Sequence, residues 1–292
     1  ARLVPVLDEL DGPAEVVFVD DGSTDGSYRR LCELREADAR IKVLRLTRNF
    51  GHQIAITAGL DHARGQAVVI MDADLQDPPE VVPELAKRWR DGFQVVYAVR
   101  DERKGESRLK LASASWFYRV MNRFGEVPIP ADAGDFRLVD RRALDDVLAM
   151  REHRRYLRGM FAWVGYDQTG VTYTRDPRHA GRTKFPLRKM LRFASDGIIS
   201  FSTVPLRLAL NLGFAVSVVS FLLGVGTIGL KAAGAGGLVP GWASVAVALT
   251  FFSGIQLTVL GVVGEYIARI YEEVKRRPLY LVRDWQAGED AR

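Results

Sequence analysis

The chain has 292 residues, enough for one large domain or two ordinary ones, and a formal net charge of +5 at neutral pH. Its single cysteine, Cys32, excludes an intrachain disulfide, which agrees with a cytosolic catalytic portion. The positive balance does not indicate a nucleic-acid partner, because the Lys and Arg residues gather beside two long apolar stretches, a placement that fits an anionic membrane face better.

The first predicted strand covers residues 15–19 and ends at a pair of carboxylates. Asp20 and Asp21 come directly after it, and Gly22 and Ser23 continue into a tight turn before the next helix. Capping that helix would require only one acid. Two acids beyond the carboxyl end of a buried strand therefore indicate a site that binds the base and ribose of a nucleotide.

A second strand, over residues 41–46, leads into a helix that begins at Gly51. His52 follows and could act as a catalytic base. A single histidine at the start of a helix is more often a surface residue or one that supports a site from behind, and we keep that interpretation.

The stretch 67–79 begins with an apolar strand, residues 67–71, that runs directly into a cluster of acidic residues. The β-branched residues predict a short buried strand of a parallel sheet. Asp72 and Asp74 would point to the same side of an extended chain, where they repel each other unless a cation lies between them. Carboxylate oxygens at this spacing favour Mg²⁺ or Mn²⁺ carrying a diphosphate. Asp77 is expected to cap the helix that begins at Pro78.

Three further segments follow a strand predicted over residues 93–99. Residues 100–110 are a charged run, either a solvated face or the approach to a flap over a lipid surface. A loop rich in Pro and small residues contains a second acidic site, Asp132 and Asp135. The basic, glycine-containing residues 172–185 suit diphosphate oxygens or, read alone, a patch that binds lipid headgroups.

Two long apolar stretches dominate the C-terminal third. No charged residue occurs from Leu208 to Leu230, and after Lys231 none occurs until Glu265. A spanning helix needs roughly 20 apolar residues, so there is room for two. The loop between them lacks Arg and both flanks are rich in Lys and Arg, so the positive-inside rule predicts cytoplasmic flanks. Lys and Arg among apolar residues over 186–201 indicate an interfacial helix.

The ordered set of motifs carries a family resemblance. Its residues are 20–23 with Asp25, 48–51, 72–78, 134–137, Arg158 and Gly159 with Trp163, Gly181 with Lys184 and Phe185, and 205–207 before the apolar stretches. Together they resemble the polyprenyl-phosphate glycosyltransferases, membrane-anchored inverting enzymes that include dolichyl-phosphate mannose synthase and the bactoprenol glucosyltransferases. Such proteins open with a further strand that ends in Pro and an Asn-Glu pair. This sequence begins after that point, so we expect the N-terminal strand to be missing.

The resemblance implies an α/β fold of the GT-A type, a Rossmann-like domain that binds a nucleotide-sugar, followed by interfacial helices and two transmembrane helices. The expected boundaries are 1–185 for the glycosyltransferase domain, 186–204 for the interfacial helices, 205–270 for the two spans (about 207–231 and 242–268) and 271–292 for a cytoplasmic tail. This organisation implies a multi-pass protein of the inner (plasma) membrane, with the catalytic domain and both termini in the cytoplasm. Glycines in the spans would allow a homo-oligomer.

The resemblance also assigns roles to residues. Asp135 and Asp74 would be the catalytic residues. A Mg²⁺ or Mn²⁺ ion would be held by Asp72, Asp74 and Gln76. The nucleotide would be bound by Asp20, Asp21, Gly22, Ser23, Asp72, Ala73, Arg178, Arg182 and Lys184. The acceptor phosphate would be bound by Arg100, Lys110, Ser113 and Ser115.

The implied reaction moves a hexose from a nucleotide-sugar, with UDP-glucose favoured, to undecaprenyl or another polyprenyl phosphate, for cell-envelope glycan or lipopolysaccharide modification. A GDP-mannose-dependent mannose synthase is the alternative within the family. A processive polysaccharide synthase would carry more spans and a Gln-x-x-Arg-Trp motif, whereas residues 154–159 read RRYLRG. A non-catalytic membrane adaptor would be expected to lose acids at Asp72, Asp74 or Asp135, and all three are present.

Overall fold

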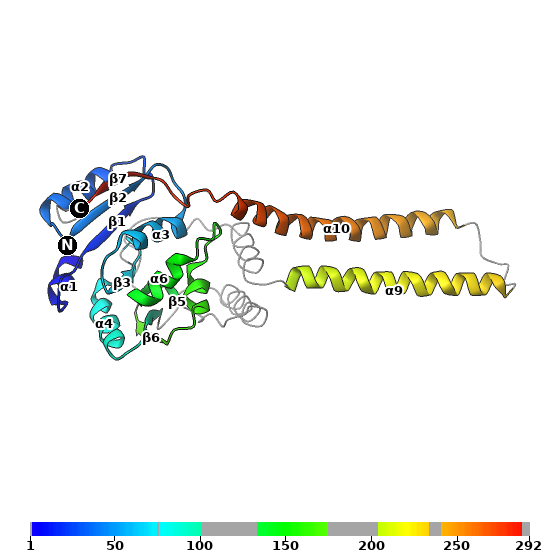
Figure 1. Cartoon of the computed structure of the whole chain (residues 1–292), viewed down its shortest axis with the longest axis horizontal. Coiled ribbons are helices and arrows are strands. Elements are labelled where there is room, and N and C mark those ends of the chain that lie inside the picture. The colour runs from blue at the N-terminus through cyan, green and yellow to red at the C-terminus, as the bar shows by residue number, and fades with distance from the viewer. Residues whose placement is uncertain (1, 75, 101–132, 175–203, 234–240, 288–292) are drawn as a thin grey trace. The chain divides into compact units, whose positions relative to one another are not determined.

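The structure is a computed structural model that describes residues 2–74, 76–100, 133–174, 204–233 and 241–287. The chain divides into two compact units. One contains Ala1–Gly197 together with Arg277–Arg292, and the other contains Ile198–Arg276 (Figure 1). Each unit is described by itself below.

The first unit alternates helices and strands. Its elements are α1 (Leu3–Glu9), β1 (Val16–Asp20), α2 (Ser27–Ala37), β2 (Ile41–Leu46), α3 (His52–His62), β3 (Ala67–Ile70), the short 3₁₀ helix η1 (Pro79–Val81), α4 (Val82–Arg90), β4 (Val95–Arg100), β5 (Ala133–Asp140), α6 (Arg141–Ala149), α7 (Leu157–Trp163), β6 (Gln168–Tyr173) and β7 (Val282–Gln286). The predicted mixed α/β architecture is therefore present.

The strands form two mixed sheets. The first has the order β1-β2-β7, with β1 and β2 parallel and β7 antiparallel to β2. The second has the order β3-β5-β4-β6, in which β5 runs antiparallel to both β3 and β4, and β4 and β6 are parallel. Residues 67–71 were expected to pair with parallel neighbours. This expectation is wrong, because β3 pairs with β5, which runs antiparallel to it. β3 and β4 do run in the same direction, as a helical crossover through α4 requires, but β5 inserts between them.

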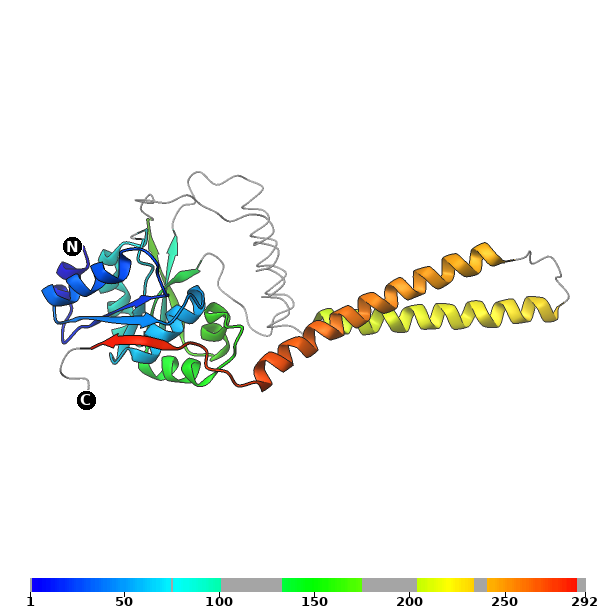
Figure 2. The same ribbon diagram turned by 90° about the horizontal axis from the view of Figure 1, so that it is seen from above.

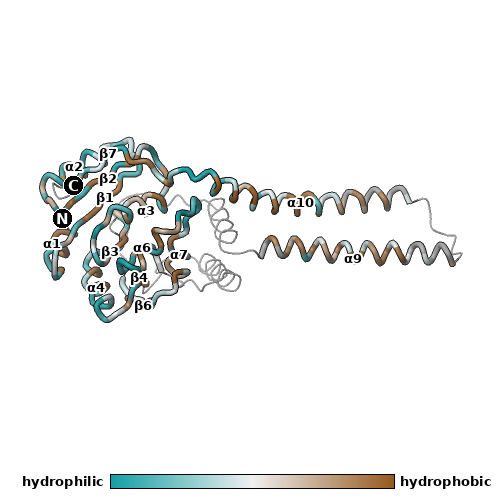
Figure 3. The backbone as a smooth tube through the Cα atoms, in the orientation of Figure 1, coloured by the Kyte–Doolittle hydropathy of each residue, from teal (hydrophilic) through white to brown (hydrophobic). Residues whose placement is uncertain are grey.

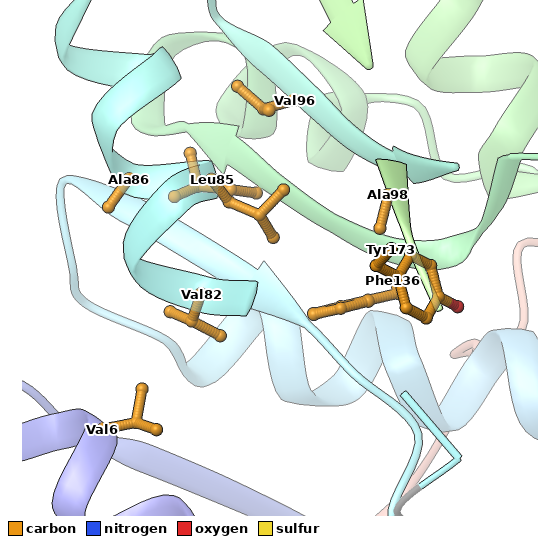
Figure 4. Packing of buried hydrophobic residues seen from close by; sticks show 9 residues of the cluster. Val6, Val82, Leu85, Ala86, Val96, Ala98, Phe136 and Tyr173 are labelled. Carbon is orange, nitrogen blue, oxygen red and sulfur yellow. The ribbon is translucent and has the colours of Figure 1, made fainter. Parts of the chain in front are cut away.

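The core of the second sheet fixes which residues of β5 face the candidate site. Phe136 and Leu138 belong to a buried cluster that also contains Val82 and Leu85 of α4, and Figure 4 shows Phe136 beside Tyr173 in this cluster. Side chains alternate along a strand, so Asp135 and Arg137 point to the opposite face. Burial of Phe136 thus determines the direction of the neighbouring carboxylate.

Asp77 does not cap the helix that follows it. The N-cap position of η1 is occupied by Pro78, and no side chain caps it by a hydrogen bond. The carboxylate of Asp77 instead accepts a hydrogen bond from the hydroxyl of Tyr173, and both residues are buried. A buried tyrosine hydroxyl requires a hydrogen-bond acceptor, and Asp77 provides it for Tyr173 of β6, which lies 96 residues further along the chain.

Within residues 204–233 and 241–276, the second unit contains two long helices, α9 (Val204–Ala232) and α10 (Trp242–Val274), which lie side by side in Figures 1 and 2. Both are long and apolar enough to cross a membrane, over Leu208–Gly226 with a mean hydropathy of 2.2 and over Phe251–Val274 with 1.4. Figure 3 shows apolar residues along much of both helices. Phe214 and Phe221 are 71% and 70% exposed, which is costly in water and favourable in lipid.

Candidate functional site

The loop after β1 is held against the loop after β2 through Asp21. Its two carboxylate oxygens accept hydrogen bonds from the backbone N–H groups of Phe50 at 2.7 Å and Gly51 at 3.0 Å. Gly22 has a φ of +67°, and a Cβ there would lie 2.4 Å from the carbonyl carbon of Arg48. The close approach of the two loops therefore requires glycine at position 22.

Asp20 lies beside these loops, buried at the end of β1. Its Oδ1 accepts a hydrogen bond from the backbone N–H of Ser23 at 3.2 Å. Its Oδ2 lies 3.3 Å from Nε of Arg45 but makes no hydrogen bond with the residues that the structure describes. A buried carboxylate oxygen in this state is an acceptor that a ligand N–H or O–H can satisfy.

Asp135 is the centre of a second group of side chains, at the start of β5. Nε of Arg158 donates to its Oδ1 at 2.7 Å, and Nε2 of His52 lies 3.1 Å from its Oδ2. Burial alone would raise the pKa of Asp135, but hydrogen bonds from His52 and Arg158 and the nearby charge of Arg137 outweigh burial. The pKa is held well below its usual range, so Asp135 is an ionised carboxylate at neutral pH.

Arg137 supplies a buried positive charge behind Asp135. Its Nη2 donates to the carbonyl oxygen of Gly134 at 2.9 Å, and its guanidinium lies 5.0 Å from the centre of the Phe161 ring in α7. Burial lowers the pKa of Arg137 to about 10, which still leaves it charged at neutral pH. This buried cation favours the ionised form of Asp135.

His52 connects the acidic strand end of β3 to Asp135. Its Nε2 is 3.8 Å from Oδ1 of Asp72 as well as 3.1 Å from Asp135. Burial raises the pKa of Asp72; the charge of His52 opposes this rise, while Asp135, Asp77 and Asp74 add to it. Three nearby carboxylates thus add to the effect of burial on Asp72, and a bound cation would oppose both effects.

Gln76 is the third residue of the predicted metal site. Its side chain is buried, and its Oε1 makes no hydrogen bond with the part of the chain that the structure describes. The exposed Asp74 accepts the backbone N–H of Gln76 at 3.1 Å. An unsatisfied amide oxygen is a ligand that Mg²⁺ and Mn²⁺ accept together with carboxylates, and the carboxylates of Asp72 and Asp74 come shortly before Gln76 in the sequence. No cluster of three or more His, Cys, Asp or Glu residues arranged for a metal occurs among the described residues.

Of the predicted site residues, some are brought together by the structure, some are described but lie apart from these contacts, and some lie outside the described ranges. The structure brings Asp20 to Ser23 against residues 48–51, and it links Asp72 to Asp135 through His52. Ala73 is exposed directly beside Asp72, and Arg100 is the last residue of β4. The residues that lie outside the described ranges are Lys110, Ser113, Ser115, Asp132, Arg178, Arg182 and Lys184.

Two side chains of α3 contribute more to the site than their sequence pattern indicates. His52 bridges two carboxylates, and Oε1 of Gln53 accepts the backbone N–H of Leu157 at 3.0 Å, which ties the start of α3 to the start of α7. The one feature of the sequence that points to His52 and Gln53 is their position at the start of a helix, directly after Gly51. Because the contacts of His52 come from residues far along the chain, the local pattern does not distinguish it from a surface histidine.

The sequence is similar to known proteins over its whole length. The profile of Glycosyl transferase family 2 matches residues 4–148. A Bacillus subtilis protein described as the uncharacterized glycosyltransferase YkcC is 47% identical over 291 residues, 100% of this chain and 90% of the relative. A Synechocystis protein described as an uncharacterized glycosyltransferase is 47% identical over 97% of this chain and 89% of its own length. A Shigella flexneri protein named SfII prophage-derived bactoprenol glucosyl transferase is 41% identical over 94% of this chain and 88% of its own length.

Proposed function

This chain belongs to glycosyl transferase family 2 and is a glycosyltransferase, and on that premise we propose that it transfers glucose from UDP-glucose to undecaprenyl phosphate with inversion at the anomeric carbon. The acceptor is inferred from the bactoprenol glucosyl transferases, which are similar to this chain along almost its full length. The observation that carries the proposal is Asp135, an ionised carboxylate held by His52 and Arg158 within reach of Asp72.

The donor nucleotide binds at the ends of β1 and β3. Asp20 offers a buried, unsatisfied oxygen to the base or ribose, and Gly22 allows the loop backbone to approach residues 48–51 closely. Asp72, Asp74 and Gln76 would hold Mg²⁺ or Mn²⁺ with the diphosphate. When bound, such an ion offsets the negative charge that grows on the departing nucleoside diphosphate. Arg178, Arg182 and Lys184 are proposed to close over the same phosphates.

Asp135 acts mainly by position and charge. A phosphate monoester has its second pKa near about 6, so the acceptor is largely dianionic at neutral pH and scarcely requires deprotonation. A carboxylate whose pKa is held well below its usual range is a poor proton acceptor. The ionised Asp135 instead orients the sugar or acceptor, while Arg100, Lys110, Ser113 and Ser115 are proposed to hold the acceptor phosphate.

The acceptor accounts for the two apolar helices. A polyprenyl phosphate has its phosphate at the headgroup plane and its tail in the bilayer, so its enzyme benefits from a membrane anchor. The length and composition of α9 and α10 and the Lys and Arg residues that flank them support a multi-pass protein of the inner membrane, with both termini cytoplasmic.

The experiment that tests the proposal is sugar transfer by the full-length protein in detergent. Radiolabelled UDP-glucose is supplied with undecaprenyl phosphate, and the label is measured in the lipid extract. The expected result is label in the extract only when the phosphorylated acceptor is present, and its loss in the Asp135→Asn variant. Equal label with undecaprenol, which lacks the phosphate, would contradict the proposed acceptor.

A further inference from the structure

The last strand of the chain, β7, is part of the same sheet as the proposed donor site. It follows α10 in sequence and pairs antiparallel with β2, whose other neighbour is β1 (Figures 1 and 2). Contacts from Tyr280, two residues before the strand, and from the strand itself hold it in place: the hydroxyl of Tyr280 donates to Asp61 at 2.8 Å, and Trp285 packs on the ring of His62 with the ring centres 4.8 Å apart. The strand is therefore an integral element of the α/β unit.

Three charged residues lie in one row across this sheet. Asp20 of β1 is paired in register with Arg45 of β2, and Arg45 is paired in register with Asp284 of β7. Directly paired residues on neighbouring strands place their side chains on the same face. Arg45 thus has a carboxylate on either side, and its Nε is 3.3 Å from Oδ2 of Asp20.

Tyr28 of α2 contacts two residues of this row, Arg45 and Asp284. The guanidinium of Arg45 lies 4.3 Å from the centre of the Tyr28 ring, and the tyrosine hydroxyl donates a hydrogen bond to Asp284. Gln286 of β7 donates from Nε2 to the Tyr28 hydroxyl at 3.0 Å and to Asp284 at 3.1 Å. β7 therefore fixes the aromatic ring, and the ring with Asp20 fixes the guanidinium.

We propose that β7 contributes to the donor site. In this proposal Asp284 is a positioning residue, which holds the carboxylate of Asp20 in place through Tyr28 and Arg45. The buried Oδ2 of Asp20 makes no hydrogen bond within the described chain. The orientation of this carboxylate therefore determines how well it accepts a hydrogen bond from a nucleoside N–H or O–H. This inference rests on the proposed function, because it assigns the nucleoside of the donor to Asp20.

The row also explains why a residue so far along the chain matters to donor binding. Asp284 and Tyr28 are separated by |i−j|=256, and their contact exists only because β7 adds to the edge of β2. Without Asp284, Tyr28 loses the acceptor of its hydroxyl and Arg45 loses one of its two flanking carboxylates. Arg45 is then free to move, and Asp20 with it.

The test compares three variants of the full-length protein in detergent. Asp284→Asn removes the charge but keeps an acceptor for Tyr28, Tyr28→Phe removes only the hydroxyl, and Arg283→Ala is the matched control, an exposed side chain on the same strand. Dissociation constants for UDP and GDP are measured by calorimetry, and KM and kcat are measured with UDP-glucose. Unfolding temperatures are recorded in parallel, because lost stability alone lowers the folded fraction without changing KM.

The expected result is that Asp284→Asn and Tyr28→Phe weaken nucleotide binding and raise the donor KM by about fivefold or more, with kcat within about twofold of wild type. Arg283→Ala should leave both constants unchanged. Unchanged nucleotide binding in the folded Asp284→Asn and Tyr28→Phe variants would overturn the inference, and so would a fall in kcat at constant KM.

Asp20→Asn separates failure of the inference from failure of the proposed function. If Asp20→Asn weakens nucleotide binding and Asp284→Asn does not, β7 has no positioning role although the donor site stands. If Asp20→Asn leaves nucleotide binding intact, the nucleoside does not bind at Asp20, and the inference about β7 fails with that assignment, whereas sugar transfer to the lipid acceptor is decided by the transfer assay. In the double variant, an effect smaller than the sum of the two single effects supports action of Asp284 through Asp20.

Discussion

Nε2 of His52 lies 3.1 Å from Oδ2 of Asp135, although |i−j|=83 separates the two residues. The same nitrogen is 3.8 Å from Asp72, so one imidazole joins the acidic strand end of β3 to the carboxylate of β5. The two acidic motifs are therefore parts of one site. Its geometry depends on the first turn of α3.

Replacing His52 should reduce turnover more than donor binding. In His52→Ala, Asp135 loses one hydrogen-bond donor and Asp72 loses its nearby cation, so the two carboxylates are no longer held in one arrangement. We expect kcat to fall by about tenfold or more, with a smaller change in the donor KM. Steady-state kinetics on His52→Ala and on His52→Gln, which retains an N–H donor, checks this. Full activity in His52→Ala would show that the bridge is dispensable.

The free energy of unfolding should depend on pH through the pair of His52 and Asp135. The hydrogen bond to Asp135 raises the pKa of His52 against the opposing effect of burial, so the contribution of His52 is complete below the unfolded value of about 6.5 and is lost as pH rises through the higher folded value. The pKa of Asp135 is lowered, so its contribution is present above about pH 4 and is lost as pH falls.

The difference in unfolding temperature between wild type and His52→Ala should accordingly be largest between about pH 4 and about pH 6.5 and should shrink as the pH rises above that window. Thermal unfolding in detergent across this range measures the difference. A difference that is constant with pH would mean that His52 stabilises the fold by packing rather than by charge.

Asp135 and Asp74 should give different kinetic signatures. Asp135→Asn removes the negative charge that His52 and Arg158 hold in place, so we expect kcat to fall by about 100-fold or more while nucleotide binding is kept. Asp74→Asn should weaken binding of both donor and metal, which calorimetry with UDP and Mn²⁺ detects. Near wild-type turnover of Asp135→Asn would move the catalytic assignment to Asp132.

Gly22 should tolerate no side chain. Alanine there combines a φ of +67° with a Cβ only 2.4 Å from the Arg48 backbone, so Gly22→Ala should lower the free energy of unfolding by about 1–3 kcal/mol or more and weaken nucleotide binding. Gly12→Ala is the matched control, because Gly12 also has a positive φ, +118°, but nothing lies within 4 Å of its Cβ position. Equal effects of the two substitutions would contradict a role for the close approach of the loops.

Local patterns in the sequence predicted the elements of the first unit from β1 to β4. Residues 15–19, 41–46 and 67–71 match β1, β2 and β3 to within one residue at each end. Their apolar runs identify the strands, and the acids that follow residues 15–19 and 67–71 indicate the candidate site, because strand formation and ligand binding at a strand end leave a local signature. The predicted glycosyltransferase identity is confirmed by the similarity to family 2.

The features that local patterns did not predict depend on distant partners. The insertion of β5 between β3 and β4 and the pairing of β7 with β2 are long-range pairings, and a strand pattern does not reveal the direction or identity of its neighbour. Asp77 fits an N-cap by type, but Tyr173 provides a buried partner instead. His52 became a site residue only when folding brought it to Asp135.

The central claim is that this chain transfers sugar from a nucleotide donor to a polyprenyl phosphate. The most direct measurement is a transfer assay with full-length protein in detergent, undecaprenyl phosphate, Mg²⁺ or Mn²⁺, and a panel of radiolabelled UDP- and GDP-sugars. We predict a lipid-extractable product from one donor, UDP-glucose, and its loss on addition of EDTA. No product from any donor, with protein that is folded and binds nucleotide, would contradict the claim and favour a non-catalytic membrane adaptor.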